Sequence, residues 1–324
     1  MFLAELHCGR VAGLGASRQE EGLGRVVAVV NQKGGVGKTT TSINLAAALA
    51  MTGRPTLLVD ADPQANSTRA LGFPADPDRP SIYDALSGGT HADQIRVGYP
   101  PVPHLSLVPS DTDLVGMEVE LVEADEREYR LKRFLEGERE LFDHVVIDCP
   151  PSLGLITINA LVAADAVLVP VQAEYLALEG VSQLMQTIER VREALNPGLA
   201  IAGVLITMYD DRTNLARQVV EDVRSVFGDQ VFRTIVPRSV RLGEAPSHGQ
   251  PIFLYDGRSR GAEAYRRLTE EYLSHEEKGA GQGAEQPHPA RTSEASAGGS
   301  LPDAVAGGSE GAGAAADRRR SDLA

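Results

Sequence analysis

Short aliphatic runs alternate along the chain with longer segments in which apolar residues recur at helical spacing. The aliphatic runs show little apolar–polar alternation, which is typical of strands buried on both faces of a parallel sheet. We expect strands at residues 25–31, 56–60, 105–110, 144–150, 166–171, 203–209 and 232–237. We expect amphipathic helices at residues 39–53, 114–137, 179–195 and 214–228. This alternation predicts an α/β fold: a doubly wound, mostly parallel sheet with helices on both faces, in a single domain.

The two ends of the chain lack this pattern. Residues 1–24 show no clear period, and we predict a poorly ordered leader there. Residues 277–324 are rich in Gly, Ala and Ser, so burial cannot offset the entropy lost on ordering them. We therefore predict a folded domain at residues 25–276, followed by a disordered tail.

Composition narrows the class of protein. Of the 324 residues, 42% are hydrophobic, which is enough for a sizeable core. The two cysteines, Cys8 and Cys149, cannot form a disulfide framework, and no secretory signal or membrane-spanning apolar run is evident. We therefore expect a soluble cytoplasmic protein.

The net charge of -14 argues against constitutive coating of nucleic acid, because such binding depends on Lys and Arg at phosphates. The charge is not evenly spread. Residues 201–270 contain ten arginines against nine acidic residues, a net charge of +1, which leaves -15 for the rest of the chain.

The stretch NQKGGVGKTT, residues 31–40, lies between an expected strand and an expected helix. A tight glycine-rich turn would be the plain structural explanation. The context is nevertheless that of a phosphate-binding loop, in which backbone N–H groups and a helix N-terminus bind phosphate. Lys38 would reach the outer phosphates and the Thr39 hydroxyl would bind Mg²⁺, so ATP and Mg²⁺ are the expected ligands. The predicted nucleotide-binding residues are Lys33, Gly34, Gly35, Val36, Gly37, Lys38, Thr39 and Thr40.

Gln32 stands where the usual phosphate-loop pattern has its first glycine, and an additional lysine, Lys33, follows it. Lys33 could be a solvated surface charge. Its position before Gly34 and Gly35 matches the deviant Walker A pattern Lys-Gly-Gly-x-Gly-Lys-Thr, so the loop resembles that of the ParA/MinD superfamily of ATPases. The resemblance implies that Lys33 crosses a dimer interface to the partner's nucleotide, where a second cation can neutralise charge on the γ-phosphate.

Three aspartates follow buried strands, at the edge where open α/β sheets bind ligands. An aspartate at a strand end is often only a turn residue. Asp148 stands where a Walker B carboxylate binds Mg²⁺. The resemblance implies that Asp62 orients or activates the attacking water. It also implies that Asp60 supports either the residues around Mg²⁺ or the region around Lys38. The predicted catalytic residues are therefore Lys33, Lys38 and Asp62. We expect Cys149 to be only a small buried residue.

Seven blocks, in order from about residue 25 to residue 275, resemble the ParA/Soj branch of chromosome-partitioning ATPases. They are NQKGGVGKTTTSINLAAALA, LLVDADPQANSTRALG, VVIDCPPSLGLITINAL, VPVQAEYLALEGVSQL, TMYDDRTNLARQVVEDV, VPRSVRLGEAPSHGQPI and DGRSRGAEAYRRL. The resemblance implies an ATP-bound sandwich homodimer, hydrolysis of ATP to ADP and phosphate, and a ParB-like centromere-binding partner that stimulates hydrolysis. It also implies a cytoplasmic, nucleoid-associated protein.

The same resemblance assigns further contacts. Met208 and Pro237 would bracket the adenine, although Pro237 could simply end a strand. Arg212 and Arg241 match DNA-contacting arginines of the Soj branch, although nearby acidic residues could pair with them. A two-fold dimer doubles the phosphate contacts on one surface, so we expect non-specific binding of double-stranded DNA that depends on ATP.

Three alternatives carry weaker signals. A MinD-like membrane-associated positioning ATPase needs a C-terminal amphipathic helix, and residues 279–324 offer few bulky apolar residues, so no stable membrane association is expected. A redox enzyme like the nitrogenase iron protein needs more cluster cysteines than Cys149 provides. A non-enzymatic scaffold would not need Lys38, Thr39, Asp62 and Asp148 in these positions.

Overall fold

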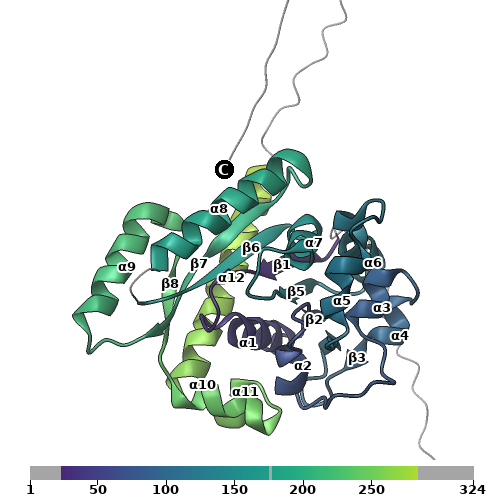
Figure 1. The fold of residues 1–324 in the computed structure, drawn as a ribbon. Coiled ribbons are helices and arrows are strands. Elements are labelled where there is room, and N and C mark those ends of the chain that lie inside the picture. Colours follow the sequence, from purple (N-terminus) through teal and green to yellow (C-terminus); the bar gives the residue numbers. More distant parts are fainter. Residues whose placement is uncertain (1–22, 175–176, 284–324) are drawn as a thin grey trace, which may run out of the picture. The chain divides into compact units, whose positions relative to one another are not determined.

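Eight strands form one sheet in the order β3-β4-β2-β5-β1-β6-β7-β8 (Figure 1). Every neighbouring pair is parallel except β3 and β4, which are antiparallel. The strands span Arg25–Val29 (β1), Thr56–Asp60 (β2), Val97–Gly98 (β3), Leu105–Val108 (β4), His144–Asp148 (β5), Ala166–Gln172 (β6), Ala200–Tyr209 (β7) and Val231–Pro237 (β8). The predicted doubly wound, mostly parallel sheet is confirmed.

The computed structural model describes residues 23–174 and 177–283. Its α-helices are Lys38–Met51 (α1), Asn66–Ala70 (α2), Ile82–Ser87 (α3), Ala92–Ile95 (α4), Leu114–Glu120 (α5), Arg130–Glu138 (α6), Leu155–Ala163 (α7), Ala177–Ala194 (α8), Asn214–Phe227 (α9), Val240–Glu244 (α10), Ile252–Asp256 (α11) and Arg260–Gly283 (α12). Short 3-10 turns lie at Arg127–Tyr129 (η1), Gly228–Gln230 (η2) and Ala245–His248 (η3).

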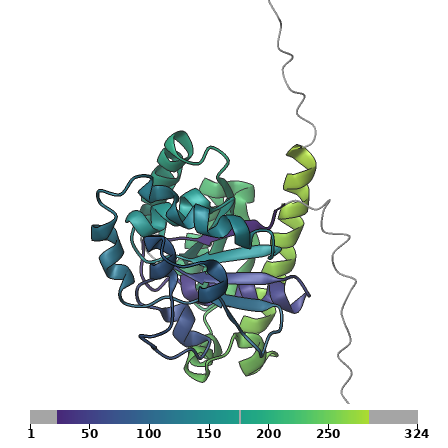
Figure 2. The ribbon, with the colours of Figure 1, turned by 90° about the vertical axis from the view of Figure 1, so that its right-hand side faces the viewer.

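The central strands are buried on both faces, which explains their continuous aliphatic sequence. In β1, Val26 and Ala28 pack into the core on one side of the sheet, and Val27 and Val29 pack into the core on the other. Helices α3 to α9 cover the first side, whereas α1, α2 and α10 to α12 cover the second. Figure 2 shows the sheet between α12 and the teal helices of the opposite layer.

One predicted helix is wrong. Residues 114–137 form α5 and α6 rather than one continuous helix, because the chain turns between them and Glu126 adopts a left-handed φ of 51°. The helix predicted at residues 39–53 is confirmed as α1, and Gly53 follows it with a left-handed φ of 85°.

The boundaries at the two ends differ partly from the prediction. Gly24, placed in the predicted leader, donates its N–H to the Arg139 carbonyl at 2.8 Å. Residues 277–283, placed in the predicted tail, continue α12. Residues 1–22 and 284–324, which hold the rest of the leader and tail, lie outside the described residues, as does Cys8.

Within the described part of the chain, none of the helices combines the length and the apolar character required to cross a bilayer.

Candidate functional site

The phosphate loop runs from the end of β1 to the first residue of α1. Gly35 and Gly37 take left-handed φ values of 75° and 89°, a conformation that glycine adopts without the steric cost of a Cβ. The loop is anchored from β7, where the Thr207 hydroxyl donates to the Val36 carbonyl at 2.8 Å. The backbone between Gly34 and Lys38 is therefore held in the turn that the sequence predicted.

Lys38, the first residue of α1, has a buried side chain, 7% exposed. Its Nζ donates to the Lys33 carbonyl at 3.1 Å, and no ion pair to Lys38 is found among the described residues. Burial lowers the pKa of Lys38, opposed by the nearby Asp148 carboxylate. A buried ammonium without an ion-pair partner, beside a glycine-rich loop, fits an anion such as a phosphate group.

Lys33 lies at the rim of the loop and points to the end of β6. Its Nζ forms an ion pair with Glu174, and both side chains remain partly exposed, at 38% and 40%. The Lys33 backbone N–H donates to Asn31 Oδ1 at 2.9 Å, while the Asn31 amide donates to the Pro170 carbonyl at 2.7 Å. The Lys33 backbone is thus held in place by hydrogen bonds. Its ammonium is paired with a surface carboxylate that another anion could replace.

Asp148, at the end of β5, joins the phosphate-loop helix to the segment after β2. Its Oδ1 accepts from Ser42 of α1 at 3.0 Å, and its Oδ2 accepts from Ser67 of α2 at 2.7 Å. Burial raises the pKa of Asp148 to about 6, although hydrogen bonds from Ser67, Thr39 and Ser42 lower it. Neither serine was predicted from the sequence, since an isolated serine carries no distinguishing pattern.

Asp60 is the neighbour of Asp148 on β2 and is fully buried. Its Oδ2 accepts from both the backbone N–H and the hydroxyl of Thr68, at 2.8 and 2.7 Å, and its Oδ1 accepts from the Asp62 N–H at 3.2 Å. Burial and the Asp148 charge raise the pKa of Asp60 to about 8. Asp60 therefore holds the segment that carries Asp62.

Asp62 lies in the loop between β2 and α2 and is 6% exposed. Its Oδ1 accepts from the Gln64 N–H at 2.9 Å, which fixes the carboxylate in a tight turn. Its Oδ2 receives no hydrogen bond from residues that the structure describes. One carboxylate oxygen is consequently available for a water molecule or a ligand.

These residues fit a magnesium ion bound together with phosphate. Thr39, at the start of α1, lies beside Asp148 and helps to lower the pKa of that carboxylate, so a hydroxyl and a carboxylate lie close together here. No group of three or more His, Cys, Asp and Glu side chains suited to a metal is found in the described ranges. Mg²⁺ does not require one, because it commonly keeps several waters and binds through one or two carboxylates and substrate phosphates.

A cavity of about 200 Å³ adjoins the phosphate loop. Its lining includes Gly37 from the loop, Thr40 from the first turn of α1, and Thr207, Met208, Pro237 and Arg238 at the ends of β7 and β8. Met208 has a left-handed φ of 50°, an uncommon conformation for a residue other than glycine. Met208 and Pro237, the predicted adenine contacts, thus line one cavity next to the phosphate loop.

The predicted DNA contacts lie on the surface and are already paired. Arg212 forms hydrogen bonds to both oxygens of Asp210, at 2.8 and 2.6 Å, and these bonds lower the pKa of Asp210 to about 2. Arg241 pairs with Glu244 at 3.0 Å and with Asp256 at 3.4 Å. Surface ion pairs contribute little to stability, so either arginine can exchange its carboxylate for a phosphate.

Comparison with known proteins agrees with this geometry. A family model described as an AAA domain matches residues 24–201. The chain is 53% identical over 249 residues to the sporulation initiation inhibitor protein Soj of Bacillus subtilis, covering 77% of this chain and 98% of Soj. It is 50% identical over 277 residues to the chromosome partitioning protein ParA of Myxococcus xanthus, covering 83% and 95%.

A solved structure of Mycobacterium smegmatis cobyrinic acid a,c-diamide synthase, with bound ADP and magnesium, matches with a TM-score of 0.70 and 40% identity. The match covers 79% of this chain and 97% of that one. A fold with this phosphate loop and these carboxylates, together with relatives of such high identity and coverage, identifies the family. The chain belongs to the ParA/Soj family of chromosome-partitioning ATPases.

Proposed function

We propose that this ATPase works as a switch between a monomer and an ATP-bound homodimer that binds double-stranded DNA without sequence preference. A ParB-like centromere-binding partner stimulates hydrolysis, and loss of the γ-phosphate releases the dimer from DNA. The protein acts in the cytoplasm on the nucleoid. Residues 25–276 form the ParA-type ATPase domain, and α12 carries its helical end on to residue 283.

This proposal rests on the positions of Lys33 and Lys38. Lys38 is buried inside the loop and has no ion-pair partner among the residues that the structure describes, so it is suited to the phosphates of its own nucleotide. Lys33 lies at the rim, where its ammonium holds only a partly exposed carboxylate. A second copy presenting its own nucleotide could displace Glu174 and take this ammonium, because phosphate carries more charge than one carboxylate.

Hydrolysis on this proposal uses Asp62 to hold the attacking water, since the Gln64 N–H fixes one oxygen of this carboxylate and none of the described residues donates to the other. A bound Mg²⁺, held through Thr39 and Asp148, would supply charge neutralisation at the phosphates. Asp148 bonds to both α1 and α2, so the serine hydroxyls would connect the phosphate loop to the segment that carries Asp62.

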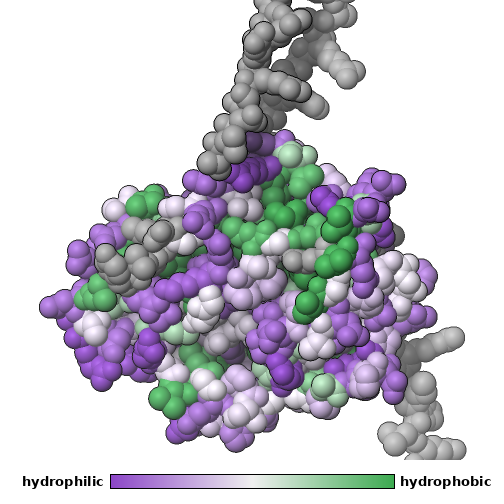
Figure 3. All heavy atoms as spheres, viewed as in Figure 1, coloured by the Kyte–Doolittle hydropathy of each residue, from purple (hydrophilic) through white to green (hydrophobic). Residues whose placement is uncertain are grey.

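An apolar surface supports a contact with a second copy. Val115, Val119 and Val122, on and just after α5, are 61%, 76% and 57% exposed. Figure 3 shows apolar residues gathered on this side of the molecule, over α5 and α7. Exposed aliphatic residues in such numbers are typical of interaction surfaces.

Sedimentation of the full chain tests the switch. With saturating Mg-ATP, Asp62→Ala should form a stable dimer that sediments with duplex DNA, whereas the same protein with ADP should remain a monomer. Lys33→Ala in the Asp62→Ala background should bind ATP and stay monomeric. A single subunit under saturating Mg-ATP in the Asp62→Ala protein would refute the proposal.

The arginine contacts have a separate test. Arg212→Ala combined with Arg241→Ala should abolish ATP-dependent retention on DNA and leave nucleotide binding intact. Unchanged retention by this double variant would remove these two residues from the DNA-binding surface.

A further inference from the structure

Two glycines from distant parts of the chain bring their backbones together where α2 packs against η3. Gly72 follows α2, and Gly249 follows η3. Both take left-handed φ values, 81° and 65°. A Cβ added at Gly249 would come within 2.9 Å of Gly72 Cα and 3.2 Å of Gly72 N, so only glycine permits this approach. We call it the glycine contact.

Gly72 ends a short segment that begins with Asp62, and we call residues 62–72 the Asp62 segment. The Ala65 N–H donates to the Asp62 carbonyl at 2.8 Å, and the Arg69 N–H donates to the Ala65 carbonyl at 3.0 Å. The Gly72 N–H then donates to the Arg69 carbonyl at 2.9 Å. These hydrogen bonds connect Gly72 to Asp62, so a displacement of Gly72 should be passed along the segment.

The turn that carries Gly249 is attached at two further points. The Tyr99 hydroxyl donates to the Gly249 carbonyl at 2.9 Å, and Tyr99 is buried. The Ile252 N–H donates to Asn44 Oδ1 of α1 at 2.8 Å, while Asn44 Nδ2 donates to the Thr40 carbonyl at 2.8 Å. The turn is therefore attached both to the β3–β4 side of the sheet and to the helix that follows the phosphate loop.

Helix α1, to which this turn is attached, is also bonded to α12. The Thr41 hydroxyl of α1 and the Tyr265 hydroxyl of α12 form a buried hydrogen bond of 3.1 Å. Thr41 is fully buried, and Tyr265 is 1% exposed. The Gly249 turn is thus attached to a well-packed part of the core.

The chain before Gly249 reaches the other end of the nucleotide site. Ser239, Leu242 and Gly243, just before and within α10, line the cavity beside the phosphate loop. Gly249, a few residues later, contacts the end of the Asp62 segment. Residues 239–249 therefore connect the cavity proposed for the base to the segment proposed to hold the attacking water.

A carboxylate that holds an attacking water must be placed accurately, because a displacement of about 1 Å can cost roughly a hundredfold in rate. Ser67 and Thr68 bond the middle of the Asp62 segment to buried carboxylates of the sheet. The glycine contact supports the far end. Two supports set the direction of the segment as well as its distance from the phosphates. We propose that Gly72 and Gly249 are positioning residues for ATP hydrolysis, which act through Asp62.

This inference rests on the proposed role of Asp62. The test variant is Gly249→Ala in the full chain, because its added methyl group must displace Gly72. The control is Gly53→Ala: Gly53 also has a left-handed φ, 85°, but a Cβ there meets nothing within 4 Å. Both variants carry the strain of alanine at a positive φ, so the difference between them isolates the glycine contact.

Gly249→Ala should lower kcat for ATP hydrolysis, measured by phosphate release, about tenfold relative to Gly53→Ala. ATP affinity, measured by fluorescence titration, should stay within about twofold, since Lys38 and Thr39 belong to α1 and not to the displaced segment. Sedimentation with Mg-ATP should give the same fraction of dimer for both variants.

A double variant shows whether the effect passes through Asp62. In the Asp62→Ala background, under single-turnover conditions with protein in excess over ATP, Gly249→Ala should cause no further loss of rate. A residue that acts only by placing a carboxylate has no effect once that carboxylate is gone.

A milder variant covers the case in which Gly249→Ala does not fold, as judged by circular dichroism. Tyr99→Phe removes only the hydroxyl that holds the Gly249 carbonyl, and it should lower kcat about threefold without changing ATP affinity. Its control is Tyr129→Phe, which removes a hydroxyl that donates to the Leu195 carbonyl at 3.4 Å on the other side of the sheet. This control should leave kcat unchanged.

Equal kcat values for folded Gly249→Ala and Gly53→Ala would overturn the inference. A matching loss of ATP affinity would also overturn it, because the glycine contact would then serve nucleotide binding. A full further loss in the Asp62→Ala background would show that the contact acts on another group. Normal turnover by Asp62→Ala alone would instead refute the proposed role of Asp62, and this inference with it.

Discussion

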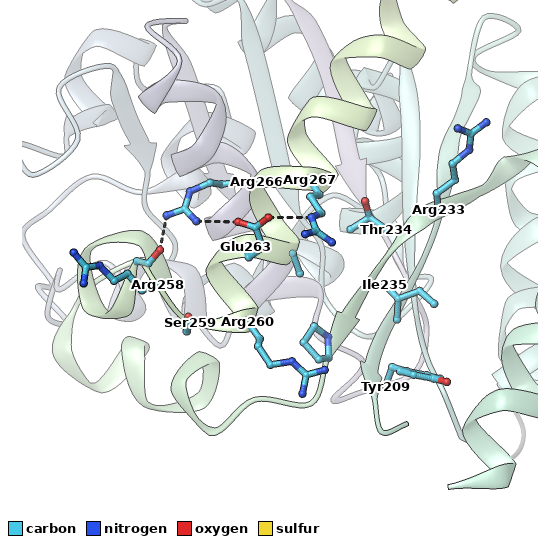
Figure 4. Close-up of a pocket in the computed structure, with 13 residues that line it drawn as sticks. Tyr209, Arg233, Thr234, Ile235, Arg258, Ser259, Arg260, Glu263, Arg266 and Arg267 are labelled. Carbon is cyan, nitrogen blue, oxygen red and sulfur yellow. Dashed lines mark hydrogen bonds and ion pairs between the residues drawn. The ribbon is translucent and has the colours of Figure 1, made fainter. Parts of the chain in front are cut away.

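The phosphate-loop site and the arginine hollow, a cavity lined by Arg233, Arg258, Arg260, Arg266 and Arg267 (Figure 4), both carry positive charge, but they are built in opposite ways. Lys38 is buried, and the carboxylates around it are held by hydrogen bonds from Ser42, Ser67 and Thr68. The hollow is exposed, and several of its guanidinium groups have no carboxylate partner among the described residues. A small ligand of fixed shape favours a preorganised site, whereas a polymer of variable sequence favours separate charges on an open surface.

The sharpest test of this comparison is Lys38→Ala. Loss of the buried ammonium should lower ATP hydrolysis on the order of a thousandfold, since a preorganised charge at the phosphates acts in a water-poor site. The control Lys132→Ala, on the surface of α6, should leave ATP hydrolysis unchanged. Phosphate release measures the rate for both variants. A Lys38→Ala protein that folds, by circular dichroism, and hydrolyses ATP normally would show that the buried site does not bind the phosphates.

Asp62→Ala should reduce hydrolysis about a hundredfold, the usual contribution of a group that accepts or orients a proton in the transition state. ATP affinity, measured by fluorescence titration, should stay within about twofold because one hydrolysis step is lost and the phosphate-binding groups remain. The exposed Asp78→Ala serves as the control. Normal turnover by Asp62→Ala would assign the water-positioning role to another residue.

The buried carboxylates predict a pH dependence that the hollow should not share. The pKa of Asp60 is raised from 3.8 to about 8, so between these values the folded chain binds more protons than the unfolded chain. Stability of the nucleotide-free protein should therefore fall as the pH rises from about 4 to 8, by at most about 1.4 kcal/mol per pH unit for this group.

Asp60→Asn should flatten this decline, as measured by urea denaturation at several pH values. Asp78→Asn, in an exposed loop, should leave the decline unchanged. An equal slope in Asp60→Asn and the unmodified protein would mean that Asp60 is ionised in both states over this range.

The smallest expected effect concerns Lys33. Glu174→Gln removes its surface ion pair, so the ammonium should be freer to contact a second subunit. The ATP concentration for half-maximal dimerisation should fall by about twofold to fivefold, the range expected for an exposed ion pair. Analytical ultracentrifugation measures this, with Glu136→Gln as a control. A weaker dimer in Glu174→Gln would indicate that Glu174 itself stabilises the assembled form.

The sequence predicted the sheet and the phosphate loop because both depend on local patterns. Continuous aliphatic runs mark the buried strands, and the glycine spacing marks the loop. It missed α7, which is buried on nearly all sides and so shows no polar face. It also missed α12, although Tyr265, Leu268 and Tyr272 recur on its buried face at helical spacing. That helix could have been found.

The sequence alone could not reveal which residues form hydrogen bonds and ion pairs with the predicted site residues. Ser42 and Ser67 reach Asp148 only because α1, α2 and β5 meet in the fold. Lys33 and Glu174 form an ion pair although most strands of the sheet lie between them in the sequence. The arginines of the hollow come from β8, from the turn before α12 and from α12 itself, and their spacing becomes visible once these elements are packed together. Whether an arginine is paired or unpaired is likewise a property of the folded chain.

The buried hydrogen bond between the Thr41 and Tyr265 hydroxyls joins α1 to α12. A substitution at either hydroxyl should therefore alter the packing of both helices, so its effect should not stay confined to the helix that carries it. If the proposed DNA binding holds, selection for tighter DNA retention should enrich changes at the Thr41–Tyr265 contact as well as at Arg212 and Arg241.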